Sequence, residues 1–228
     1  MAELLAVCRV HALLPDAGSV GVTAIDKRPV EGRVTVRPLG LYADLQANRA
    51  DHGGHDQAVY AYAQEDADHW APELGREVVP GLFGENLRTR GVDVNGAVIG
   101  ERWRVGTALL EVTQPRTPCQ TFARRLGEDH WVRRFTQANR TGAYLRVVEN
   151  GELGTGDTVD VVSRPTHGVT IADWFGASHA VRGAGEPVAL ESIARRLLDA
   201  QAAGELRLST EMHQRAERAL TRATTQAP

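Results

Sequence analysis

The first three quarters of the chain consist of short β-type runs broken by turn residues, and this pattern constrains the fold more than any other feature. The runs are LLAVCRVHAL, EGRVTVRPLGL, AVYAYA, ERWRVGTALLEVTQ and AYLRVVENGELGTGDTVDVVSR. Many short strands separated by turns are typical of a β-barrel or a β-sandwich. Asn150 and Gly151 lie between two runs and predict a tight hairpin turn, because both residues tolerate a positive φ.

Helical segments interrupt these strands. The spacing predicts one helix in AQEDADHWAPELG, ending near Pro72 and Gly75, and another in GEDHWVRRFTQA, where acidic residues at the front favour the helix dipole. The predicted fold class is therefore mainly β, or α+β, with peripheral helices around a barrel.

The character of the sequence changes after RPTHG. TIADWFGAS, EPVALESIARRLLDAQAAG and LSTEMHQRAERALTRA carry helical spacing, with Thr170, Pro187 and Ser209 as starts and Gly204 as a stop. Three short helices form a marginal core by themselves. We therefore expect them to pack on the barrel or on a second subunit of a homodimer.

This change of pattern predicts two parts, a β-barrel domain over residues 1–164 and a small three-helix domain over residues 165–228. The chain of 228 residues has a net charge of -3, which provides no general attraction for a nucleic acid polymer. We expect a small-molecule partner instead.

The two cysteines, Cys8 and Cys119, fit no zinc spacing and make a disulfide framework improbable, which favours a reducing compartment. The N-terminus has no basic leader, and no later run is long enough to span a bilayer. We therefore expect a cytoplasmic protein with no membrane partner.

Cys119 stands in the segment VTQPRTPCQTF, where Pro115 and Pro118 limit the backbone and hold the thiol at the end of a strand. Arg116, three residues before it, favours the thiolate, which attacks electrophiles and binds soft metals. A cysteine packed as a small hydrophobe is the ordinary alternative, and Cys8, on a predicted strand, is assigned to that class.

The loop ADHGGHDQAVYAY precedes a predicted strand, and its paired glycines, Gly53 and Gly54, free backbone amides to form an anion-binding nest. His52 and His55 have the spacing of metal ligands, but the loop lacks the helical context of zinc enzymes, so a zinc site is the weaker interpretation. Turn and cap chemistry explains these residues equally well.

Two further loops carry polar candidates. GLFGENLRTRG contains Glu85 and Asn86, which offer hydrogen-bonding edges for a flat heterocycle. AIDKRPVEGRV is interpreted as a loop that supplies Lys27 and Arg28, whose ordinary role is solvated surface charge.

Taken in order, these segments resemble the MOSC domain, the family named for the C-terminal part of molybdenum cofactor sulfurases. The matching stretches are KRPVEGRVTV, GLYADLQANRADHGGHDQAVYAY, FGENL, GERWRVGTALLEVTQPRTPC and GAYLRVVENGELGTGD. The similarity is greatest to the stand-alone YiiM-like branch, whose members carry a three-helix tail. The resemblance implies a MOSC-type β-barrel.

The resemblance also implies that the protein binds the molybdenum cofactor, molybdopterin, with Cys119 as the sulfur ligand of the metal or as a sulfur acceptor. Lys27 and Arg116 become candidate contacts for the cofactor's phosphate or pyranopterin, Gly53 and Gly54 a second anion cradle, and Glu85 and Asn86 candidate contacts for the pterin edge. His52 or Asp51 would deliver protons.

Relatives of this branch are linked to the reduction of N-hydroxylated base analogues to amines. The resemblance therefore implies an oxidoreductase for substrates of the hydroxylamino purine type. The chain has no flavin fingerprint and no iron–sulfur cysteine set, so electrons would come from a separate reductase. The three-helix tail or the basic run RRLGEDHWVRR could dock that donor, although a solvated helix face is the ordinary explanation of the run.

Two other functions remain open. Cys119 could hold the cofactor or persulfide sulfur for delivery to another enzyme, which would make the chain a carrier. It could also serve a hydrolase with His52 as the base. Larger family members carry pyridoxal phosphate in a separate domain for which this chain has no room, so we expect no such cofactor.

Overall fold

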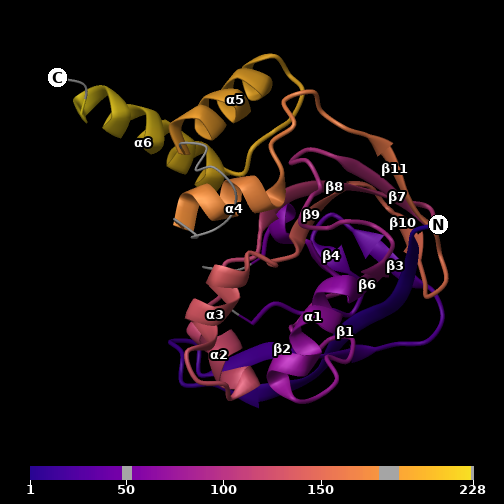
Figure 1. The fold of residues 1–228 in the computed structure, drawn as a ribbon. Coiled ribbons are helices and arrows are strands. Elements are labelled where there is room, and N and C mark those ends of the chain that lie inside the picture. The colour runs from indigo at the N-terminus through magenta and orange to yellow at the C-terminus, as the bar shows by residue number, and fades with distance from the viewer. Residues whose placement is uncertain (48–52, 180–189, 227–228) are drawn as a thin grey trace.

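The computed structural model describes residues 1–47, 53–179 and 190–226, and the described part contains a large sheet with helices at two opposite ends (Figure 1). The large sheet has the strand order β11-β7-β8-β9-β5-β6-β1-β2. Its strands are β1 (Glu3–Pro15), β2 (Val22–Pro29), β5 (Val59–Ala63), β6 (Leu87–Arg90), β7 (Arg102–Val105), β8 (Ala108–Pro115), β9 (Ala143–Glu149) and β11 (Val159–Ser163). A smaller sheet, in the order β10-β3-β4, contains β3 (Val34–Arg37), β4 (Gly40–Leu41) and β10 (Gly151–Leu153).

The large sheet does not form a closed barrel in the described part of the chain. Strands β11 and β2 end the ladder. An isolated bridge between Glu3 and Thr158 and a few backbone hydrogen bonds, such as that from Val159 N–H to the Ala2 carbonyl, join the start of β11 to β1 without forming a ladder. Strand β1 also changes its partner, because it pairs with β6 in its first half and with β2 in its second. The expected closed barrel is therefore not confirmed, and the fold is a mixed α+β fold.

The predicted hairpin turn at Asn150 and Gly151 is wrong. Strand β10 pairs with β3 and not with β9, so the chain changes sheets at this point. Gly151 does not have a positive φ. Its small size is needed instead, because a Cβ there would lie 2.5 Å from the backbone of Ala108.

The predicted helices are confirmed. They are α1 (Gln64–Leu74), α3 (Trp131–Ala138), α4 (Ile171–His179), α5 (Leu190–Ala202) and α6 (Thr210–Gln226), and one short helix that was not predicted, α2 (Gln120–Leu126), follows Cys119. Helix α1 continues past Pro72 and ends at Gly75, which takes the left-handed conformation. Helix α3 begins only at Trp131, so its acidic flank precedes the helix instead of forming its first turn.

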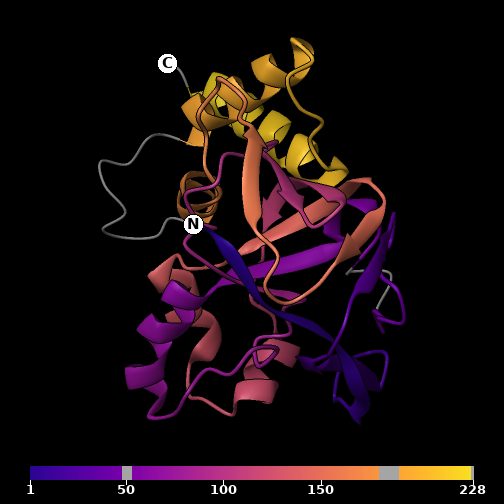
Figure 2. The same ribbon diagram turned by 90° about the vertical axis from the view of Figure 1, so that its right-hand side faces the viewer.

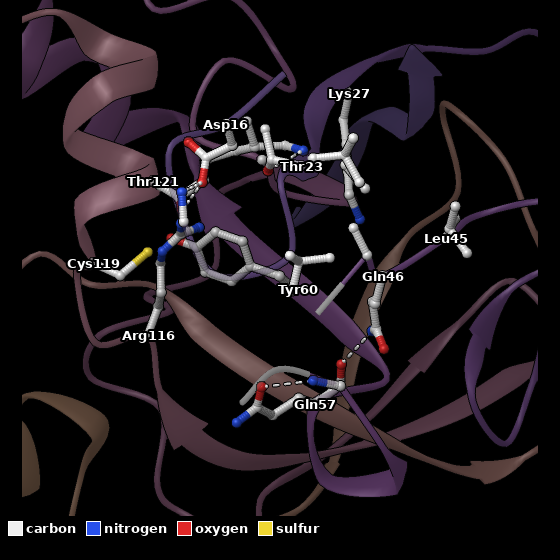
Figure 3. A pocket seen from close by; sticks show the side chains of 18 of the residues that line it. Asp16, Thr23, Lys27, Leu45, Gln46, Gln57, Tyr60, Arg116, Cys119 and Thr121 are labelled. Atoms are coloured by element: carbon white, nitrogen blue, oxygen red, sulfur yellow. Dashed lines mark hydrogen bonds between the residues drawn. The ribbon is translucent and has the colours of Figure 1, made fainter. Parts of the chain in front are cut away.

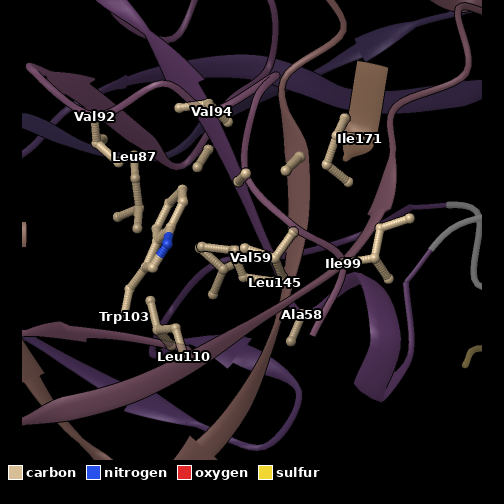
Figure 4. Packing of buried hydrophobic residues seen from close by; sticks show 14 of the residues in the cluster. Ala58, Val59, Leu87, Val92, Val94, Ile99, Trp103, Leu110, Leu145 and Ile171 are labelled. Atoms are coloured by element: carbon tan, nitrogen blue, oxygen red, sulfur yellow. The ribbon is translucent and has the colours of Figure 1, made fainter. Parts of the chain in front are cut away.

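Figures 1 and 2 show α1, α2 and α3 together on one side of the large sheet and α4, α5 and α6 at the opposite end. The apolar cluster shown in Figure 4 contains Val59, Trp103 and Leu145 from strands together with Ile171 from α4. Leu197 of α5 belongs to the same cluster, so the C-terminal helices pack on the strands, as one of the two alternatives predicted. The domain boundary at residue 164 stays a prediction.

A second, aromatic cluster lies between strand β5 and helices α1, α2 and α3, and it includes Trp70, Phe83 and Phe122. Because side chains alternate along a strand, β5 sends Tyr60 to this cluster and Val59 to the first one. Cys119 packs against this aromatic cluster. None of the described helices is long and apolar enough to cross a bilayer.

Candidate functional site

A pocket of about 370 Å³ lies between strand β2, the hairpin tip that joins β1 to β2, and the segment that leads into α2 (Figure 3). Among the residues proposed from the sequence, it is lined by Lys27, Gly53, Asn86, Arg116 and Cys119. These residues come from segments that are far apart in the chain. The tertiary structure therefore brings most of the sequence candidates to one cavity.

Cys119 stands where its proline-rich segment predicts, just after strand β8, which ends at Pro115. It is the N-terminal cap of helix α2 and has an extended backbone, with φ -127° and ψ 172°. Its side chain is half-buried, and in Figure 3 the sulfur points toward the side chains of Arg116 and Tyr60.

Arg116 is a buried cation beside this thiol. Its Nη1 donates a hydrogen bond of 2.7 Å to the carbonyl oxygen of Phe83, and its guanidinium stacks over the rings of Phe122, at 4.3 Å, and Tyr60, at 5.1 Å. Burial by itself lowers the pKa of Arg116, but Tyr144, Tyr60 and Cys119 outweigh that effect and raise the pKa. The guanidinium therefore keeps its charge inside the pocket.

Lys27 lies on strand β2, and the prediction that it stands in a loop is wrong. Its Nζ forms a 2.6 Å ion pair with Oδ2 of Asp44, a residue that the sequence did not suggest. Asn86 Nδ2 donates to the same carboxylate oxygen at 2.8 Å and to the carbonyl of Cys8 at 3.1 Å. The Asn86 side-chain oxygen accepts from the backbone N–H of Tyr60 at 3.1 Å. Both ends of the Asn86 amide therefore make hydrogen bonds within the protein.

Glu85 does not line the pocket. It is fully buried, and its carboxylate accepts hydrogen bonds from the backbone N–H groups of Gly81, at 2.7 Å, and Phe83, at 3.1 Å. It also forms a buried ion pair with Arg88. Glu85 thus organises the loop that presents the Phe83 carbonyl to Arg116.

The two glycines of the HGG stretch have different positions. Gly53 lines the pocket, has a φ of +98°, and donates its backbone N–H to Gln57 Oε1 at 3.0 Å. A Cβ at Gly53 would lie 1.8 Å from Gln46 Oε1, so a side chain does not fit while Gln46 holds its place. Gly54 lines a neighbouring cavity of about 380 Å³ that shares Leu45 and Gln46 with the first. Asp51 and His52 lie outside the described residues.

Sequence reasoning missed a polar group in the wall of the pocket beside helix α2. Asp16, in the hairpin tip, accepts hydrogen bonds from Arg124 Nε and Nη2, both at 2.8 Å, and from Thr121 Oγ1 at 2.9 Å. The hydrogen bond from Arg124 is the main reason that the pKa of Asp16 is lowered to about 2. Only the basic run that contains Arg124 gave a signal, and it was interpreted as a solvated face.

Cys8 is a core residue, as predicted. It is fully buried on strand β1, and burial raises the pKa of its thiol to about 12. Such a thiol is inert at neutral pH. Within the ranges that the structure describes, no group of three or more histidine, cysteine, aspartate or glutamate side chains could hold a bare metal ion.

Comparison with known proteins identifies the family. The model of the MOSC domain matches residues 48–160. YflK of Bacillus subtilis (strain 168) is 34% identical over 149 residues, which cover 65% of this chain and 67% of YflK. The chain belongs to the MOSC domain family.

Two further relatives are similar in sequence to this MOSC protein. YiiM of Escherichia coli (strain K12) is 32% identical over 145 residues, which cover 62% of the chain and 65% of YiiM. A protein named reductase from Gibberella moniliformis (strain M3125 / FGSC 7600) is 31% identical over 147 residues, which cover 63% of the chain but 26% of that protein. The matched region thus spans somewhat less than two thirds of YiiM and about a quarter of the fungal protein.

Solved structures have the same fold as this MOSC protein. YiiM from Geobacillus stearothermophilus superposes with a TM-score of 0.74 at 24% identity, covering 96% of this chain and all of the other. YiiM from Escherichia coli gives a TM-score of 0.73 at 22% identity, covering 97% and 94%. The superposition covers nearly the whole chain, so the fold is that of the YiiM structures. The sequence similarity to YiiM of Escherichia coli supports the YiiM-like branch.

Proposed function

We propose that this MOSC protein binds the molybdenum cofactor in the Cys119 pocket and reduces N-hydroxylated compounds, of the hydroxylamino purine type, to amines. The observation that carries the proposal is the position of the Cys119 thiol, which lies in one cavity with the buried cation Arg116 and the glycine loop at Gly53. One of the relatives is named a reductase, which supports an enzymatic role for the family.

The side chains in the pocket fit this cofactor. A molybdenum ion that arrives with its own organic ligand needs few protein ligands, and a thiolate is a suitable soft ligand. The described lining includes three cationic side chains, Lys27, Arg116 and Arg124, and one carboxylate, that of Asp16. Lys27 is paired with Asp44 and Arg124 with Asp16, so Arg116 is the main source of net positive charge for the anionic phosphate of the cofactor.

Aromatic side chains complete the pocket. The rings of Tyr60 and Tyr144 line it with their centroids 5.2 Å apart. Tyr60 is buried under Arg116, so Tyr144, which is half-buried, is the ring that would pack against a planar pterin or substrate. Arg116 would hold the Cys119 sulfur in its ionised form, ready to act as a ligand. Lys27 is already paired with Asp44, so it would have to hold the phosphate and this carboxylate at the same time.

When bound, the cofactor supplies a two-electron centre that can take the hydroxyl oxygen from an N–OH group. The overall reaction consumes one N-hydroxy compound, two electrons and two protons, and it releases one amine and one water. The electrons come from a separate electron-transfer protein.

The proposal is tested by purifying the protein from a host that makes the cofactor. The molybdenum content and the steady-state reduction of a hydroxylamino purine are then measured for the natural protein, Cys119→Ala and Cys8→Ala. We expect Cys119→Ala to lose both properties, and Cys8→Ala to keep both because Cys8 lies in the core outside the pocket.

Two outcomes would contradict the proposal. Active protein without molybdenum would exclude the cofactor. Full occupancy by molybdenum without turnover under any electron donor would instead identify the chain as a carrier that holds the cofactor on Cys119.

A further inference from the structure

The outer half of the β1–β2 hairpin is an arm that extends beyond the rest of the sheet. Strand β1 pairs with β6 only over its first residues, whereas the arm, with Leu14 and Pro15 opposite Thr23 and Val22, pairs with no third strand in the described part of the chain. The pairing also shifts register twice between Val10 and Leu14. Two-stranded hairpins are only marginally stable by themselves, so the arm needs an anchor.

Two carboxylates bind the arm to helix α2. Asp26 of β2 forms a 2.6 Å ion pair with Arg125, and Asp16 is the contact at the tip. Its two carboxylate oxygens accept the Nε and Nη2 hydrogen bonds of Arg124, both at 2.8 Å, and Oδ2 also accepts from Thr121 Oγ1 at 2.9 Å. Both partners belong to helix α2, whose N-terminal cap is Cys119. The same carboxylate accepts the backbone N–H of Gly18 at 3.1 Å, which orders the turn.

The anchored tip forms one wall of the Cys119 pocket. Asp16, Gly18, Ser19 and Val20 line it from the arm, and Cys119 lines it from the adjoining segment that leads into α2. A tip that moved away from α2 would remove this wall and widen the entrance.

We propose that Asp16 is a positioning residue that holds the arm against helix α2 and thereby decides which molecules reach Cys119 by their size. The contact is suited to reversible opening, because an ion pair with a partly exposed partner contributes little free energy, and 40% of the Arg124 side chain is exposed. The inference does not depend on the proposed function, since it concerns access to a thiol and not the chemistry of a cofactor.

The test measures alkylation of Cys119 in full-length protein purified from a host that does not make the molybdenum cofactor. Two reagents with the same reactive group are used, N-ethylmaleimide and a maleimide that carries fluorescein. The ratio of their rates reports access by size, because the ionisation of the thiol affects both reagents equally. Cys119→Ala confirms that the signal comes from Cys119 and not from the buried Cys8.

In Asp16→Ala, we expect the bulky reagent to react up to about fivefold faster relative to the small one, the change that loss of such an ion pair permits. Arg124→Ala should change the ratio in the same direction but by less, because the hydrogen bond from Thr121 to Asp16 remains. The double variant should equal Asp16→Ala, because Asp16 takes part in both contacts.

Asp157→Ala is a matched control. Asp157 also accepts two hydrogen bonds from one arginine, Arg33, both at 3.1 Å, and the backbone N–H of Gly154 at 2.9 Å, but it does not line the pocket. Its rate ratio should equal that of the natural protein even if its melting temperature falls. An unchanged ratio in Asp16→Ala, or an equal rise for both reagents, would overturn the proposal.

Discussion

The guanidinium carbon of Arg116 lies 4.3 Å from the centroid of the Phe122 ring, so the cation is held across the segment on which Cys119 stands. Replacing Arg116 by Met keeps much of the volume and removes the charge. We expect the alkylation rate of Cys119 at pH 7 to fall by roughly tenfold, because a neighbouring cation stabilises the thiolate. Initial rates with iodoacetamide over a range of pH measure the effect. Arg102→Met, which removes an exposed cation outside the pocket, is the control, and equal rates in the two variants would contradict the role of Arg116.

The ion pair of Asp16 predicts a specific dependence of stability on pH. The pKa of Asp16 is lowered to about 2, mainly by Arg124, whereas an aspartate in an unfolded chain titrates near pH 4. The stabilisation is therefore fully present above about pH 4 and is lost as the pH falls toward about 2. In urea unfolding at a series of pH values, the stability difference between the natural protein and Asp16→Asn should stay constant from pH 8 to about pH 4 and shrink below it. A difference that grew on acidification would contradict this sign.

Glu85 is expected to be a structural residue. Glu85→Gln leaves the fully buried Arg88 without its carboxylate partner, so the free energy of unfolding should fall by about 3–5 kcal/mol. Glu149→Gln, which removes the partner of the partly exposed Arg104, should cost less than about 1 kcal/mol. Denaturant titration compares the two. Normal stability together with loss of cofactor in Glu85→Gln would show instead that Glu85 contacts the pterin.

The two glycines of the HGG stretch should respond differently to alanine. Both have a positive φ, but a Cβ at Gly53 meets Gln46 Oε1, whereas a Cβ at Gly54 has no atom within 4 Å. Gly53→Ala must therefore displace Gln46 and break its 3.0 Å hydrogen bond to the Gln57 carbonyl, while Gly54→Ala meets only backbone strain. We expect Gly53→Ala to retain less molybdenum than Gly54→Ala after gel filtration. Equal retention of molybdenum in the two variants would argue that the part of the pocket lined by Gly53 does not contact the cofactor.

Helix α4 begins with a reciprocal pair of hydrogen bonds. Thr170 Oγ1 accepts the N–H of Asp173, and Asp173 Oδ2 accepts the N–H of Thr170, both at 3.0 Å. Thr170→Ala should lower the free energy of unfolding by about 1 kcal/mol, the usual loss for an N-terminal cap. Thr158→Ala, which removes an exposed hydroxyl that donates to Asp160, is the control and should cost less than about 0.5 kcal/mol.

Local signals in the sequence determined most of the helices and strands. Thr170 caps the start of α4. Gly75 follows α1 and Gly204 lies just after α5, both in the left-handed conformation. Helix starts and stops could be predicted because they depend only on the nearest few residues. The proline-stiffened segment placed Cys119 correctly after β8 for the same reason. The proposal that Cys119 is a ligand comes from the resemblance to the MOSC domain, and the comparisons show that family.

Only the tertiary structure decided which distant groups meet. Asp16 and Arg124 are 108 positions apart, and Lys27, Asp44 and Asn86 form their network across three segments. The partner of β10 was decided in the same way, because strand pairing satisfies backbone groups between segments that no local pattern links. The local sequence thus placed Cys119 on a proline-limited segment three residues after Arg116. The packing of distant segments determined the burial of that cation and the pocket wall that the β1–β2 arm forms.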